Sequence, residues 1–161
     1  MAKARKKVRA RRKPSGRKAS ARRTTKVKAK ARPKHKFTVS HHREADFDQG
    51  LRSYAKYRDL GIAPATGGMV QAHVIRFIPP FRPEDVSTPH FHDVDFQMIY
   101  VLKGWIKSEF EGEGVHTFHA GSCWIQPPHI KHTVLGYSDD CELLEIVLPA
   151  DFETVELTEE A

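Results

Sequence analysis

The residues of this chain that are best suited to chemistry are three histidines. His90 and His92 are separated by one residue, Gln97 follows after four more, and His132 lies further along the chain. Side chains two residues apart point the same way only on an extended strand, because side chains alternate across a sheet. Imidazole is a ligand that suits zinc, copper, iron and nickel. The pattern therefore indicates a metal centre inside a β-structure, built from two histidines on one strand and a third from a later strand.

Glycine and proline residues stand at fixed distances from these histidines, in two blocks. The first block holds His90, His92 and Gly104, and the second holds Gly121, Pro127 and His132. The blocks resemble the two motifs of the cupin superfamily, and the resemblance covers roughly residues 50–155. It implies an all-β double-stranded β-helix, a jelly-roll barrel. It also implies a divalent ion, with iron, manganese, nickel and zinc all open, held by His90, His92, His132 and the residue at position 97.

The chain departs from the family motifs at several positions. The family's ligating Glu is replaced by Gln97, and the other departures are Asp85, His129 and Gly136. Three neutral imidazoles and a neutral amide leave the charge of a divalent ion uncompensated, which favours a bound anion at an open position. Asp93 and Asp95 are the nearest carboxylates in the sequence, as substitute ligands or as partners of a ligand. Replacing Gln97 by Glu is expected to strengthen metal binding.

Further residues are candidates for the wall of the cavity. Trp124 and Gln126 share one face by alternation, so we expect both to line the pocket, and ordinary barrel core is the alternative. His73 lies in the middle of a predicted strand, where it either faces the cavity or serves as a structural histidine. Glu145 stands among apolar residues and needs a partner if it is buried, for which Arg76 is the candidate.

Charge is distributed very unevenly along the chain. Residues 1–36 hold 18 of the 27 Lys and Arg and none of the 20 Asp and Glu. Such a segment buries too little apolar surface to offset its ordering entropy, so we expect a disordered tail. It would bind nucleic acid or another polyanion without sequence preference. A solvated extension without a partner and a targeting segment are the alternatives. Residues 37–49 are expected to be a linker and residues 50–161 the barrel domain.

Short apolar runs separated by turn residues follow from residue 50 onward. Turn signals recur about every 8–12 residues, which is typical of an all-β sandwich or barrel. Residues 51–60 favour a strand over a helix, residues 63–68 predict a turn, and residues 91–102 are an apolar-rich stretch of the motif strands that ends at a turn at Gly104. We expect an edge strand or a short helix in residues 151–161.

Neither cysteine belongs to a CxxC motif, which favours a reduced cytoplasm, and no apolar run is long enough for a membrane span. Two functions from different classes remain open. The favoured one is a non-haem metal-dependent enzyme, a dioxygenase-like oxidoreductase or a related type, that acts on a small molecule. The alternative is a non-catalytic cupin module that binds a small ligand and is tethered to a polyanion by its tail. The sequence identifies no catalytic acid or base, and the resemblance also implies a homodimer.

Overall fold

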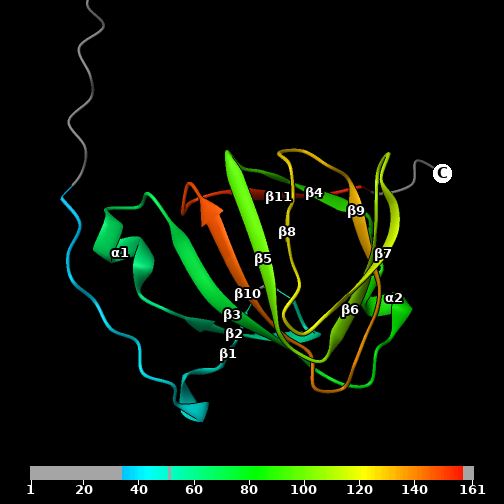
Figure 1. Cartoon of the computed structure of the whole chain (residues 1–161), viewed down its shortest axis with the longest axis horizontal. Coiled ribbons are helices and arrows are strands. Elements are labelled where there is room, and N and C mark those ends of the chain that lie inside the picture. Colours follow the sequence, from blue (N-terminus) through cyan, green and yellow to red (C-terminus); the bar gives the residue numbers. More distant parts are fainter. Residues whose placement is uncertain (1–33, 51, 158–161) are drawn as a thin grey trace, which may run out of the picture. The chain divides into compact units, whose positions relative to one another are not determined.

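The computed structural model describes residues 34–50 and 52–157, so the basic tail lies outside it except for its last three residues. Two antiparallel sheets form the described part of the chain, and they face each other as the two walls of a barrel (Figure 1). This confirms the all-β barrel that the sequence predicts. No helix in residues 34–50 and 52–157 is long and apolar enough to cross a membrane.

The larger sheet has the strand order β1-β2-β3-β10-β5-β8. Residues 51–60, for which we favoured a strand, do contain β2. The short helix α1 (Ile62–Thr66) replaces the turn expected at residues 63–68, and Gly67 ends it in the left-handed conformation at φ 66°. The strands of this sheet are β1 (Asp48–Gln49), β2 (Ala55–Asp59), β3 (Gln71–Phe77), β5 (Phe96–Lys103), β8 (Cys123–Ile125) and β10 (Glu142–Leu148).

The smaller sheet has the strand order β11-β4-β9-β6-β7. The chain passes from this sheet to the larger one between Asp93 and Phe96, so the apolar-rich residues 91–102 are divided between two strands in different sheets. The helix α2 (Pro83–Val86) precedes the first of them. The strands of this sheet are β4 (His90–Asp93), β6 (Trp105–Phe110), β7 (Gly114–His119), β9 (His132–Tyr137) and β11 (Glu153–Glu156).

The interior changes character along the strands. The inward side chains of β5 run from buried Gln97 to buried Ile99 and Val101, and the last two belong to the apolar core. Phe77 and Tyr137 close that core, with ring centroids 4.4 Å apart. One end of the barrel is therefore filled by apolar packing, and polar side chains gather in the other.

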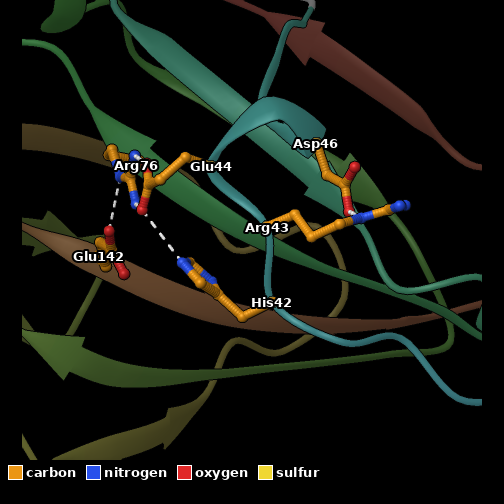
Figure 2. Close-up of polar contacts among 6 residues, drawn as sticks. All are labelled: His42, Arg43, Glu44, Asp46, Arg76 and Glu142. Atoms are coloured by element: carbon orange, nitrogen blue, oxygen red, sulfur yellow. Dashed lines mark hydrogen bonds and ion pairs between the residues drawn. The ribbon is translucent and has the colours of Figure 1, made fainter.

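The segment expected as a linker contributes to the larger sheet. Its 3₁₀ turn η1 (Glu44–Asp46) leads into β1, and Phe47 between them is buried. The Arg76 guanidinium lies 3.8 Å from the centre of the Phe47 ring and bonds Glu44 on one side and Glu142 on the other, at 2.7 and 2.6 Å (Figure 2). The prediction that Arg76 pairs with Glu145 is wrong, because the register places Arg76 opposite Glu142 on the outer face.

Candidate metal centre

The three histidines come together from two neighbouring strands of the smaller sheet. His90 and His92 lie on β4, and His132 begins β9 directly opposite His90. One ring nitrogen from each histidine lies within 4.8 Å of the other two. His90 and His132 are buried, and His92 is half-buried. The alternation and the cross-strand pairing expected from the sequence therefore produce a cluster of three imidazoles.

Hydrogen bonds at the Nδ1 atoms orient all three rings. Nδ1 of His90 donates to the carbonyl of Thr88 at 2.8 Å, and Nδ1 of His132 donates to the carbonyl of Ile130 at 3.1 Å. Nδ1 of His92 lies 2.9 Å from the hydroxyl of Thr154, which can accept its hydrogen. A neutral imidazole with its hydrogen on Nδ1 has a free lone pair on Nε2. The carbonyl partners fix this tautomer at His90 and His132, and the Thr154 hydroxyl is compatible with it at His92.

The surroundings also keep these rings neutral. Burial lowers the pKa of His90, lowers that of His92 to about 4, and lowers that of His132 to about 3. The mutual repulsion of the rings adds to the effect at His92 and His132. Neutral imidazoles offer three nitrogen lone pairs at physiological pH without first losing a proton.

Gln97 and Gln126 connect this cluster to the larger sheet. Gln97 is 1% exposed, and its Oε1 accepts a hydrogen bond from Nε2 of Gln126 at 3.0 Å. The same Gln126 nitrogen lies 3.0 Å from Nε2 of His132. The carbonyl oxygen of Gln97 therefore faces the side of the cavity that holds the imidazoles, where it could act as a fourth ligand.

Glu145 and His73 lie next to Gln97 on the larger sheet. Glu145 Oε1 accepts from Nε2 of Gln97, and Glu145 Oε2 accepts from Nε2 of His73, both at 2.6 Å. Burial raises the pKa of Glu145, but the bonds from His73 and Gln97 outweigh it and leave the pKa below its usual value. The cavity therefore contains one ionised carboxylate, which the sequence reasoning had assigned to a different partner.

All of these side chains line one cavity of about 290 Å³. Trp124 and Gln126 are in its wall, as expected from their alternation, and Trp124 stacks on Phe118 with ring centroids 4.0 Å apart. His73, for which the sequence left two roles open, faces the same space. Arg52 also lines the cavity, and its guanidinium pairs with Glu156. Sequence reasoning missed Arg52 because only the tertiary structure brings it to the histidines.

The carboxylates closest in sequence to the histidines lie elsewhere. Asp93 is exposed and bonds His129 at 2.8 Å, and Asp95 is exposed as well. Neither lines the cavity. Their expected role as substitute ligands is contradicted, because Asp93 ends β4 on its outward side and Asp95 lies where the chain changes sheets.

The donor set fits a divalent ion. Three imidazole nitrogens converge, and imidazole is a common ligand of zinc, iron and nickel. The Gln126 N–H group occupies the direction of the His132 lone pair, which a bound ion would otherwise take. These observations define a class of molecule: a double-sheet β-barrel with a polar cavity and a cluster of three histidines at one end.

Comparison with family models gives one match to a segment of this chain. The cupin domain model matches residues 81–147, which include all three histidines and Gln97. No curated protein matches the chain. Residues 81–147 therefore resemble a cupin domain in sequence, and the two-sheet barrel has the fold of cupin proteins.

Solved structures with the same fold are distant in sequence. KdgF from Halomonas sp. has 22% identity and a TM-score of 0.53, over 68% of this chain and 94% of that protein. The polyketide cyclase RemF from Streptomyces resistomycificus has 19% identity and a TM-score of 0.55, over 76% and 89%. Oxalate decarboxylase from Lactobacillus farciminis has 16% identity and a TM-score of 0.56, over 70% of this chain and 34% of the enzyme. Such similarity supports the fold alone.

Proposed function

We propose that this cupin is a metal-dependent enzyme that acts on a small anionic molecule inside its cavity. A divalent ion would be held by His90, His92 and His132, with the Gln97 oxygen as fourth ligand. The observation that carries the proposal is the clustering of the three imidazoles, which have a ring nitrogen each within 4.8 Å of the other two and a hydrogen-bond partner at each Nδ1 atom.

The charges around the cavity favour an anion. A divalent ion would be only partly balanced by Glu145, and the Arg52–Glu156 pair is neutral as a whole. The cavity would then keep a net positive charge, and an anionic ligand at an open coordination position would compensate it. Arg52 is placed to bind a carboxylate of that ligand, because a guanidinium donates two parallel hydrogen bonds to such a group.

The chain's residues would divide the work of binding and orientation. When bound, the ion supplies Lewis-acid chemistry or a site for dioxygen, the latter being the dioxygenase-like reaction that the resemblance favours. Trp124, Phe152 and Ile99 provide apolar wall that excludes water, and Arg52 orients the anionic end of the molecule. About 290 Å³ limits the ligand to a small molecule. Oxalate decarboxylase is among the solved proteins with this fold, and the enzyme from Bacillus subtilis has Mn(II) centres. It is a precedent for a metal ion in such a barrel.

Elemental analysis of the purified full-length chain tests the metal centre. We expect about one iron, manganese, nickel or zinc per chain, and near-complete loss of that metal in the variant His92→Ala. The variant His116→Ala is the matched control, because it also removes one imidazole but from an exposed position on β7. Equal metal content in the His92→Ala variant and the wild type would reject the proposal.

A further inference from the structure

The weakest member of the proposed ligand set is the amide of Gln97. An amide oxygen is a weaker ligand than a carboxylate, and an amide can rotate so that its nitrogen faces the metal. A fixed orientation of the amide would prevent the rotation, and a negative charge close to the amide would strengthen metal binding. Both are found at the contact between Gln97 and Glu145.

We propose that Glu145 is a positioning residue of the metal centre, which acts through Gln97 by holding the amide oxygen toward the metal and by supplying negative charge behind it. The inference rests on the proposed metal-binding function. It assigns to this chain a carboxylate–amide–metal arrangement, in which Gln97 takes the place of the imidazole in the carboxylate–histidine–metal arrangement known from other sites.

The orientation follows from hydrogen-bond chemistry alone. Nε2 of Gln97 lies 2.6 Å from Glu145 Oε1 and donates a hydrogen bond to it, because an amide N–H donates and a carboxyl oxygen accepts. The other amide atom is then the oxygen, which accepts from Gln126 at 3.0 Å on the side of His132. Rotating the amide by half a turn would place oxygen against a carboxylate and N–H against the N–H of Gln126. Both contacts would be repulsive, so one orientation is fixed.

The position of Glu145 is itself fixed by the sheet. Glu145 lies directly opposite His73 on β3 and diagonally from Gln97 on β5. His73 donates to the carboxylate oxygen that Gln97 leaves free, and Tyr57 packs edge-on against the His73 ring at 5.4 Å. The side chains of Glu145 and His73 are each 12% exposed. The carboxylate therefore has both oxygens bonded and little freedom to turn away from Gln97.

The charge is close enough to matter for a bound ion. The negative charge of Glu145 acts to raise the pKa of His90, His92 and His132, against the larger effect of burial. The electric field of Glu145 therefore reaches all three histidines. Among the described residues that line the cavity, Glu145 is the only Asp or Glu. Glu145 thus provides the charge that the replaced family Glu would have provided as a direct ligand.

Cobalt(II) and zinc(II) titrations of the full-length chain test this role. Glu145→Gln keeps the shape of the side chain and removes only the charge, and Glu145→Ala also releases the amide. The matched control is Glu142→Gln, which removes one carboxylate from the same strand but from the outer face, where it pairs with Arg76. Isothermal titration calorimetry gives the affinity, and the visible absorption of bound cobalt(II) reports the ligand field.

We expect Glu145→Gln to weaken zinc(II) binding about 10–100-fold, the usual effect of losing a partner behind a metal ligand, and to shift the cobalt(II) spectrum. Glu142→Gln should leave both within twofold of the wild type. Adding Gln97→Glu to the Glu145→Gln variant should restore affinity, because a carboxylate then binds the ion directly.

The outcomes separate the inference from the proposed function. If the wild-type chain binds neither cobalt(II) nor zinc(II), the metal centre itself is rejected and the role of Glu145 with it. If the wild type binds and Glu145→Gln binds with the same affinity and spectrum, the metal centre stands and the positioning role is overturned. The same is true if Glu142→Gln weakens binding as much as Glu145→Gln, because the effect would then be one of overall charge.

Discussion

Replacing Gln97 by Glu tests the geometry of the cavity without reference to any reaction. The sequence alone suggested that this change restores the family's ligand and strengthens the site. The structure shows what the new carboxylate would meet, because Gln97 Nε2 lies 2.6 Å from Glu145 Oε1. In the metal-free protein, Gln97→Glu therefore exchanges a hydrogen bond for a contact between two carboxylates.

The loss of stability in Gln97→Glu can be worked out in two independent ways. Two unit charges about 4 Å apart repel by about 4 kcal/mol at an effective dielectric constant of about 20. Alternatively, one carboxyl takes up a proton and the hydrogen bond re-forms, which at pH 7 costs about 3.7 kcal/mol for a group with an ordinary pKa of about 4.3. The protein takes the less costly route, so we expect a loss of about 3–4 kcal/mol in the free energy of unfolding. The melting temperature should fall by more than about 10 °C.

The pH dependence has a definite sign. In the folded variant the shared proton is held with a raised pKa, so the native hydrogen bond is fully present below the unfolded pKa of about 4.3 and is lost as the pH rises. The stability difference from wild type should therefore be small near pH 4, about 1 kcal/mol at pH 5, and largest at neutral pH. Urea denaturation of chelator-treated protein at several pH values measures it.

The double variant Gln97→Glu with Glu145→Gln is the control. It restores one carboxylate and one amide in exchanged positions, and should recover most of the stability at pH 7. A divalent ion should also stabilise Gln97→Glu more than it stabilises the wild type, because the cation relieves the repulsion. Wild-type stability of metal-free Gln97→Glu at pH 7 would refute the reasoning, since the two side chains could not then be in contact.

Three further predictions concern other parts of the chain. Burial raises the pKa of Cys141 to about 12, whereas Cys123 is exposed, so Ellman's reagent should find one reactive thiol in the folded protein and two in guanidinium. Arg76→Ala removes the contact with Phe47 and two ion pairs, and should lower the free energy of unfolding by about 2 kcal/mol in urea titrations; an unchanged midpoint would contradict the contact. The full-length chain should bind duplex DNA at about 50 mM salt and release it by about 200 mM, whereas a chain lacking residues 1–36 should not bind. Equal binding by both would reject the tail as the DNA-binding segment.

The three histidines could be predicted from the sequence because their geometry is local. Alternation fixes His90 and His92 on one face, and the glycine and proline positions around them place His132 on a later strand. Trp124 and Gln126 could be predicted as cavity residues for the same reason. Each of these inferences needs only the periodicity of a strand, which the sequence displays directly.

The remaining features depend on register and on packing between segments. The break between β4 and β5 has no strong turn signal, since Val94 and Asp95 are the only residues between the two strands. Residues 37–49 read as a polar linker because their one buried side chain, Phe47, gains its partners from β3 across the sheet. Sequence shows such a segment's composition but not the surface against which it packs.

Register also explains why the carboxylate of the cavity was assigned to the wrong partner. Arg76 and His73 are three residues apart on β3 and therefore face opposite sides of the sheet. The pairing of Glu142 with Arg76 places Glu145 opposite His73, and a slip of one residue would have turned every side chain of β10 to the other face. At position 97 the motif alone suggests a site that has lost its charge. The register shows that the carboxylate of Glu145 lies directly behind Gln97. Gln97 and Glu145 therefore have to be considered as a pair. Substituting either one alone changes the charge of the cavity and the hydrogen bond that orients the amide.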